Sequence, residues 1–315
     1  MSLNIFPLTH PHTESYQYYI SGCSDESRVI SAARLASADV FILVAHSDSA
    51  CHCSFHGGDH FGNFGRSETA RSLIDAYTVA SVNADRIAID ITAFSRRDIV
   101  SLFTSSFFMS SACEVDIYYS PGQFDDTFKV AESYGTLRLE PLVPSGVLRN
   151  RQVTEKVEPK NDLKLCLIAG LGLEIGCAST LFDYFQPDVT LPLVPSGTNR
   201  NFIDEIENNS LNILEDSLGR EFCHYDLTNP TACLMDLTQF VSAHFTTHRV
   251  VIACFGPKIF LLIALLCRRL LIASFESPVP AFLPSIWSGD FPSAAPPHDD
   301  VHSSIDPIGI GLSLG

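Results

Sequence analysis

Cations follow three predicted apolar strands, each at the point where a helix is expected to begin. Lys258 comes after the run HRVVIACF, Arg96 after RIAIDITAF, and Arg200 after VTLPLVPSG. The first turn of a helix carries the positive end of the helix dipole, so a cation there is disfavoured unless an anion lies beside it. Free N–H groups at the same end also bind anions. The pattern therefore predicts an anion-binding site at these junctions.

Small and polar residues accompany the cations. Glycine lets a ligand approach the backbone closely, and hydroxyl and amide groups donate hydrogen bonds to phosphate or ribose oxygens. A structural role is the alternative at each position, because a hydroxyl or amide can cap a helix and a cation can pair with a nearby carboxylate. The candidate ligand-binding residues are Thr92, Arg96, Gly172, Ser196, Thr198, Asn199, Arg200, Gly256 and Lys258.

Three carboxylates near the same junctions are candidates for an acid or base if the protein is an enzyme. They are Glu68, Asp90 and Glu174. A carboxylate with a raised pKa would suit a glycosidase or transferase that acts on a nucleotide or NAD. The sequence lacks the metalloprotease pattern HExxH, the phosphate-binding pattern GxxxxGK[ST] and the pair CxxC. We therefore leave catalysis open and favour binding alone.

The segment from residue 46 to residue 68 is long and rich in glycine, and it follows a predicted strand. A loop of this kind can close over a ligand, and His46, Asp48 and Arg66 are its candidate contacts. The alternatives are an exposed loop without a ligand and a zinc site formed by Cys51, Cys53, His56 and His60. The spacing Cys-x-Cys is tighter than zinc sites usually have, and no second pair follows. We expect neither a metal nor a cofactor.

Composition limits the partners and the compartment. The formal charge of −16 repels polyanions at long range, so we expect no non-specific binding to nucleic acid. Ten cysteines without a recognisable signal peptide predict reduced thiols in a cytoplasmic protein. Arg268 and Arg269 interrupt the apolar run over 259–275, which predicts a buried helix over 259–269, a strand near 271–275 and no contact with a membrane.

Short β-rich runs alternate with helix-compatible runs from Tyr16 onward, which predicts βαβ units. The expected fold class is α/β, with two Rossmann-like halves whose mainly parallel sheets are flanked by helices. A charged segment around residues 147–162 has few large apolar residues and marks the boundary. We predict a Rossmann-like domain over 1–150, a second over 151–287, and an irregular tail over 288–315.

The rhythm of two halves and the polar loops after the strands, ITAFSR at 91–96 and FGPK at 255–258, resemble the CARF and SAVED families. These are Rossmann-like sensor modules of bacterial immune systems. The resemblance implies that a cyclic oligonucleotide binds in a groove between the halves. It also implies a sensor subunit of an antiviral defence system, and we expect such a subunit to act through a separate effector protein.

Three functions follow as hypotheses. The favoured one is a cytoplasmic protein that binds a nucleotide or a nucleotide-derived signal and works with a protein partner or as a homo-oligomer. The second is a nucleotide- or NAD-processing enzyme of the glycosidase or transferase type. The third is a structural subunit of a multi-protein assembly, for which the 22 phenylalanines would supply apolar contacts.

Overall fold

The chain forms two compact units in the computed structural model. Unit 1 combines Met1–Gln123 with Pro297–Gly315, and unit 2 is Phe124–Pro296, so unit 2 is inserted into unit 1. The structure describes residues 3–8, 15–22, 29, 36–44, 66–105, 108, 113–121, 150–152, 163–172, 177–197, 200, 203–204, 206–208, 210, 222–274, 283–289 and 308–314.

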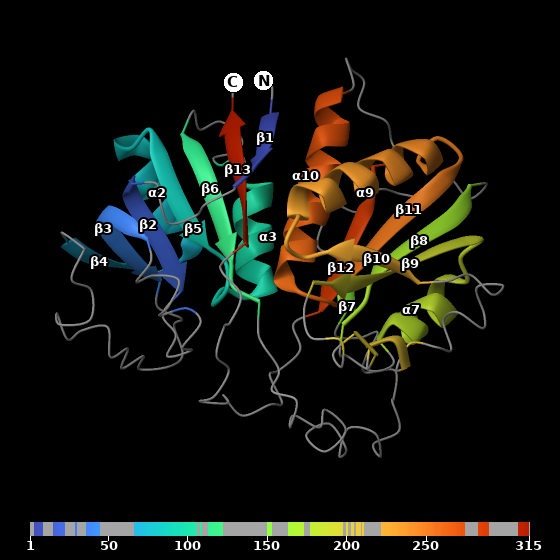
Figure 1. Cartoon of the computed structure of the whole chain (residues 1–315). Coiled ribbons are helices and arrows are strands. Elements are labelled where there is room, and N and C mark those ends of the chain that lie inside the picture. Colours follow the sequence, from blue (N-terminus) through green and yellow to red (C-terminus); the bar gives the residue numbers. More distant parts are fainter. Residues whose placement is uncertain are drawn as a thin grey trace. The chain divides into compact units, whose positions relative to one another are not determined.

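Unit 1 is built on a seven-stranded sheet in the order β1-β13-β6-β5-β2-β3-β4 (Figure 1). Strands β4, β3, β2, β5 and β6 are parallel, and β13 pairs antiparallel with β6 and β1. The parallel strands thus follow the 3-2-1-4-5 order of Rossmann-like folds. The elements are β1 (Leu3–Pro7), β2 (Ser15–Gly22), β3 (Ser37–Val44), β4 (Arg66–Ala70), α2 (Leu73–Asn83), β5 (Arg86–Asp90), α3 (Arg96–Thr104), β6 (Glu114–Tyr119) and β13 (Ile308–Leu314).

Unit 2 repeats this order in a six-stranded sheet, β10-β9-β8-β11-β12-β7. Strands β10, β9, β8, β11 and β12 are parallel. Strand β7 pairs antiparallel with β12, as β13 does with β6 in unit 1. The predicted α/β class with two mainly parallel Rossmann-like halves is therefore confirmed. The elements are β7 (Asn150–Gln152), β8 (Lys164–Gly170), α7 (Cys177–Phe185), β9 (Val189–Ser196), β10 (Cys223–Asp226), α9 (Pro230–His244), β11 (His248–Cys254), α10 (Lys258–Ser274) and β12 (Ser285–Gly289).

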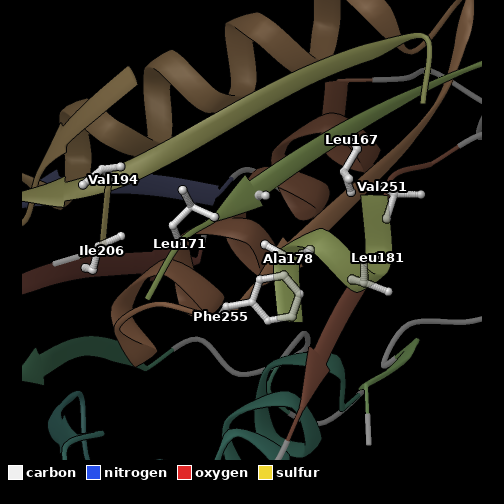
Figure 2. Packing of buried hydrophobic residues seen from close by; sticks show 10 residues of the cluster. Leu167, Leu171, Ala178, Leu181, Val194, Ile206, Val251 and Phe255 are labelled. Atoms are coloured by element: carbon white, nitrogen blue, oxygen red, sulfur yellow. The ribbon is translucent and has the colours of Figure 1, made fainter. Parts of the chain in front are cut away.

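Helices cover both faces of the unit 2 sheet. Alternate residues of β8 and β11 pack with α7 in one apolar cluster, which Figure 2 shows around Leu171, Leu181 and Phe255. The opposite face meets α10, where a Cβ on Gly170 would lie 2.2 Å from the ring of Phe260. Strands covered on both faces are apolar almost throughout, and this explains the continuous apolar run of β8.

Helix α10 is buried along most of its length and packs against α9. Its apolar residues face the sheet and α9, and even Arg269 is only 9% exposed. Within the described residues, we find no helix that is long and apolar enough to cross a membrane. The predicted buried helix is confirmed, but the strand expected near 271–275 is wrong, because α10 continues to Ser274.

The end of the chain is a strand, and the prediction of an irregular tail is wrong for residues 308–314. Strand β13 lies between β1 and β6, with Leu3 opposite Leu314, and its residue Ile310 is fully buried. On its other face a Cβ at Gly311 would lie 2.0 Å from the Phe6 ring, so the glycine leaves room for that ring. The alternation of isoleucine with glycine in IGIGL is thus a strand pattern whose second face is filled by neighbouring side chains.

Replacing Ile310 by alanine should therefore destabilise unit 1. Deleting buried isoleucine atoms leaves a cavity and costs about 2–5 kcal/mol. Urea unfolding followed by far-UV circular dichroism measures the loss, and Ser313→Ala on the same strand is the control. Trp287, the single tryptophan of the chain, lies in β12 and reports on unit 2. An Ile310→Ala protein as stable as the original would contradict a structural role for the C-terminal strand.

Candidate functional site

Each sheet has one place where the strand order reverses, called its switch point. It lies between β2 and β5 in unit 1 and between β8 and β11 in unit 2. Ligands of doubly wound α/β proteins bind at the carboxyl ends of the strands at this point, because the connections leave in opposite directions. The predicted residues at 92, 172 and 256 lie in the loops that leave these strands, and those at 96 and 258 begin the helices that follow.

In unit 2 the two switch-point loops contact each other through their backbones. The N–H groups of Phe255 and Gly256 both donate to the Gly170 carbonyl oxygen, over 2.9 and 3.0 Å. A Cβ at Gly256 would lie 2.3 Å from the carbonyl oxygen of Leu171, so only glycine fits without a backbone shift. Gly172 follows directly. The loops that contain Gly172 and Gly256 are thus in contact.

Lys258 is the first residue of α10, two positions after Gly256, and its side chain is half-buried. The next two residues, Ile259 and Phe260, are completely buried. The first turn of α10 contains no acidic residue. The positive end of a 17-residue helix and an ammonium group therefore adjoin the same glycine loop.

The next strand of unit 2 ends at Ser196, whose side chain has a structural contact. Its hydroxyl donates to the carbonyl oxygen of Tyr225 over 3.0 Å and so links β9 to β10. Gly197 has a φ of +87°, a backbone conformation that favours glycine. Arg200 is exposed. Thr198, Asn199 and Glu174 lie outside the described residues.

In unit 1, buried hydrogen bonds connect the strands and the loop at the switch point. Asp90 and Thr92 are fully buried, and an Asp90 carboxylate oxygen accepts from the Thr92 N–H over 2.9 Å. The Tyr19 hydroxyl donates to the other oxygen over 3.4 Å, and the Thr92 hydroxyl accepts from the Ser120 N–H over 2.8 Å. Asp90 and Thr92 thus hold the loop after β5 against β2 and β6.

Arg96 begins α3 as Lys258 begins α10, and it too is half-buried. The preceding Ser95 caps the helix. Its hydroxyl accepts from the Asp98 N–H over 3.2 Å, while the Asp98 carboxylate accepts from the Ser95 N–H. An acidic side chain therefore already occupies the first turn of α3, in contrast to α10.

Two further predicted residues, Glu68 and Arg66, lie away from the unit 1 switch point. Glu68 and Arg66 lie in β4, the edge strand, where they pair with Ile42 and Val40 of β3. Three strand spacings, roughly 14 Å, separate β4 from β5 and hence Glu68 from Asp90. His46 and Asp48 lie outside the described residues, as do the four potential zinc ligands between residues 51 and 60.

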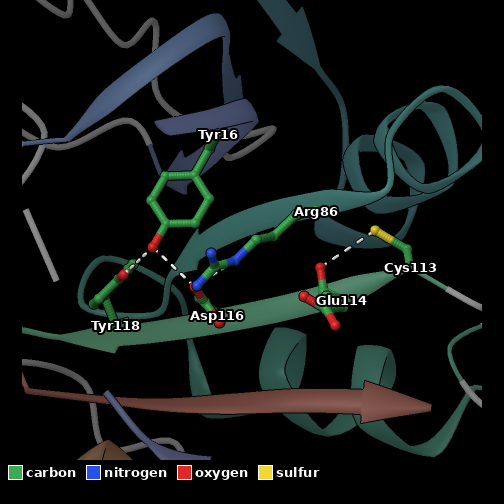
Figure 3. A network of polar contacts seen from close by, with 6 residues as sticks. All are labelled: Tyr16, Arg86, Cys113, Glu114, Asp116 and Tyr118. Atoms are coloured by element: carbon green, nitrogen blue, oxygen red, sulfur yellow. Dashed lines mark hydrogen bonds and ion pairs between the residues drawn. The ribbon is translucent and has the colours of Figure 1, made fainter. Parts of the chain in front are cut away.

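A polar network that sequence reasoning missed lies on β2, β5 and β6 (Figure 3). The Tyr16 hydroxyl donates to Asp116 over 2.8 Å and also contacts the Tyr118 hydroxyl. Arg86 donates to the same Asp116 oxygen, Oδ2, through Nε at 3.1 Å and Nη2 at 2.7 Å. The Arg86 guanidinium also lies 5.5 Å from the centre of the Tyr16 ring. An aspartate in the strand EVDIYY was the one signal for this network.

Burial dominates the electrostatics of this network. The Asp116 side chain is fully buried, and among the described residues its Oδ1 has no hydrogen-bond partner. Burial raises the pKa of Asp116, although Tyr16 and Arg86 act in the opposite direction. Burial likewise raises the pKa of Tyr16 well above its ordinary value. The carboxyl group is therefore easier to protonate in the folded chain than in the unfolded chain.

The part of the chain that the structure describes contains no group of three or more histidine, cysteine or acidic side chains able to hold a metal. Burial raises the pKa of the Cys113, Cys233 and Cys267 thiols to about 12, so they are protonated and unreactive near neutral pH. Ser313 has the GxSxG spacing of a hydrolase nucleophile. It lies within β13 opposite Asn4, whereas such a nucleophile needs a sharp strand-to-helix turn.

No protein-family model matches the chain, and no curated protein matches it. The functional interpretation therefore depends on the geometry of the two switch points.

Thr92→Val should destabilise unit 1, because it removes the acceptor of the buried Ser120 N–H. Loss of such a partner costs about 1–3 kcal/mol. Thr92→Ser keeps the hydroxyl and should retain most of the stability. Urea unfolding monitored by circular dichroism compares the two variants. Equal losses in both would show that the methyl group of Thr92, and not its hydrogen bond, matters.

Asp116→Asn should change how stability depends on pH. A carboxyl group whose pKa is raised on folding stabilises the fold below its unfolded pKa, and this contribution is lost as pH rises through the folded pKa. The stability of the original protein relative to Asp116→Asn should therefore fall as pH rises from about 4. Denaturation at several pH values up to 8 measures the trend, with Glu114→Gln on the same strand as control. A relative stability that rises with pH would mean that Arg86 outweighs burial.

Proposed function

We propose that this chain binds a nucleotide or a nucleotide-derived signal, with its phosphate at the switch point of unit 2. The observation that carries the proposal is the position of Lys258. It begins a long buried helix directly beside two loops in close backbone contact, at the place where α/β sheets bind ligands.

The chemistry of this position suits a phosphate group. The first N–H groups of a helix have no partner within the helix, and they point toward the space before its first turn. An ammonium group adds three donors and a full positive charge. The first turn of α10 has no acidic residue of its own that would repel an anion. Gly172 and Gly256 keep side chains out of the adjoining loops.

Unit 1 has a cation at the equivalent position, since Arg96 begins the helix that leaves the fourth parallel strand. We propose a secondary role for it. The carboxylate of Asp98 already lies in the first turn of α3 and accepts hydrogen bonds from Ser95. The Asp90 and Thr92 side chains hold the loop in place. Arg96 would therefore bind an anion more weakly than Lys258.

A sensor role in an antiviral defence system is a further proposal that rests on the resemblance to the CARF and SAVED families. The matching Rossmann-like strand order of both units supports the fold that this resemblance implies. Such a sensor would act in the cytoplasm through a separate effector, and would need a partner protein or a second copy of the chain to pass on its signal.

Lys258→Gln should weaken nucleotide binding by about 10–100-fold, because a hydrogen bond to a charged group contributes about 1.5–3 kcal/mol. Mass spectrometry of small molecules released from the denatured protein would first identify a bound nucleotide. Equilibrium dialysis with ATP, NAD and a cyclic dinucleotide then measures affinity. Lys164→Gln is the matched control, since this exposed lysine lies at the amino end of β8. Arg96→Gln, compared with Arg97→Gln in the next position, should have a smaller effect.

Two outcomes would oppose this proposal. Unchanged affinity of a folded Lys258→Gln protein for every probe that the original chain binds would exclude the unit 2 switch point. Conversion of a probe to product would instead favour the nucleotide- or NAD-processing enzyme.

A further inference from the structure

Two histidine rings are in contact at the other end of strand β11. His244 is the last residue of α9 and His248 is the first residue of β11. Their ring centroids lie 5.5 Å apart, with 63° between the ring planes. Strand β11 runs from His248 to Cys254, so this pair lies at the amino edge of the sheet and the Gly256 loop lies at the carboxyl edge.

The tautomer of His244 follows from its hydrogen bond. Its Nδ1 lies 2.9 Å from the carbonyl oxygen of Phe240, one helical turn earlier. A carbonyl oxygen only accepts, so Nδ1 carries the proton and the lone pair of the neutral ring is on Nε2. The Phe240 ring stacks on the imidazole, with centroids 4.3 Å apart, and fixes its orientation.

The tautomer of His248 follows from the hydroxyl group of Thr247. That oxygen lies 3.2 Å from the His244 carbonyl oxygen and 2.8 Å from Nδ1 of His248. A hydroxyl has one proton, and the carbonyl contact uses it. Both contacts are therefore hydrogen bonds at once only if Nδ1 of His248 donates. The lone pair of this ring is then also on Nε2.

We propose that His244 and His248 bind one divalent ion of the late first transition row, such as Zn²⁺, Ni²⁺ or Cu²⁺, through their Nε2 atoms. Imidazole is a preferred ligand of these ions. Two rings on one tetrahedral ion, with metal–nitrogen distances of about 2.0–2.1 Å, have centroids roughly 5 Å apart, close to the separation here. Metal-binding histidines usually donate their other N–H to a carbonyl or another acceptor, as both of these do. Water molecules would complete the coordination.

One neighbouring charge opposes the ion. Lys164 of β8 is the Cα partner of His248. It is exposed, so its ammonium group can extend into solvent on a long flexible side chain. Removing this charge should strengthen metal binding, so a substitution of Lys164 tests the proposal through an increase in affinity.

Isothermal titration of the full chain with Zn²⁺, and separately with Ni²⁺, tests the proposal. One bound equivalent should be lost in His244→Gln, in His248→Gln and in the double variant alike, because the ion needs both rings. His224→Gln is the matched control: this exposed histidine of the same unit pairs with Glu207. The other histidines of the chain contribute equally to the original chain and to the two single variants and the double variant at 244 and 248. A difference in stoichiometry among these proteins therefore identifies the site.

Two further variants distinguish a ligand role from a structural one. Thr247→Val removes the partner that holds the His248 tautomer and should weaken the affinity by about 10–100-fold without removing a ligand. Lys164→Ser should tighten it.

The proposal is overturned if His244→Gln, His248→Gln and the double variant bind as many equivalents of metal as the original chain. It is also overturned if one histidine variant loses an equivalent and the other does not. Nucleotide binding should be unaffected by His244→Gln, so failure of the metal site and failure of the proposed nucleotide site are separate results.

Discussion

The coverage of the unit 2 sheet on both faces is the constraint on which the proposed site depends. Parallel strands need crossovers that pass over a face, so their apolar side chains are buried on both sides and all their carboxyl ends meet at one edge. In unit 2 the faces are covered by α7 and by α10, which approaches so closely that Gly170 cannot carry a Cβ. The edge with the glycine loops is a consequence of this packing.

The two units have the same strand order but differ in the side chains that they bury around the central strands. In unit 1, buried polar groups lie on and beside the central strands, including Ser21, Asp90, Thr92, Asp116 and Ser120, all without exposed surface. Several of them are joined to one another, so the energy of burying them is offset inside the unit. The central strands of unit 2 are apolar, and its switch point is formed by backbone contacts and glycine. This difference supports the proposal of an anion site at the carboxyl edge of unit 2.

Much of the architecture could be predicted from local patterns, and the exceptions have physical reasons. The apolar runs of β8 and β11 predict buried strands, and Ser95 followed by Asp98 predicts the cap of α3. Strand β13 was missed because its glycines carry no side chains, and the space beside them is filled by Phe6 at Gly311 and by Leu8 and Tyr118 at Gly309. Asp116 was missed because its partners Tyr16 and Arg86 come from two other strands. Such contacts depend on sheet order, which no local pattern contains.

The candidate site was predictable to the same degree. The sequence placed Lys258 and Arg96 at the starts of helices, and both are there. It could not distinguish the two positions, because the difference lies in how each first turn is completed. In α3 a capping box supplies an acidic group from the helix itself, whereas α10 begins after Pro257, which has no N–H, and has no acidic residue in its first turn. The first turn of α10 thus combines helix N–H groups and a cation with no acidic side chain of its own, and this difference supports the proposal that an anion binds at α10 in preference to α3.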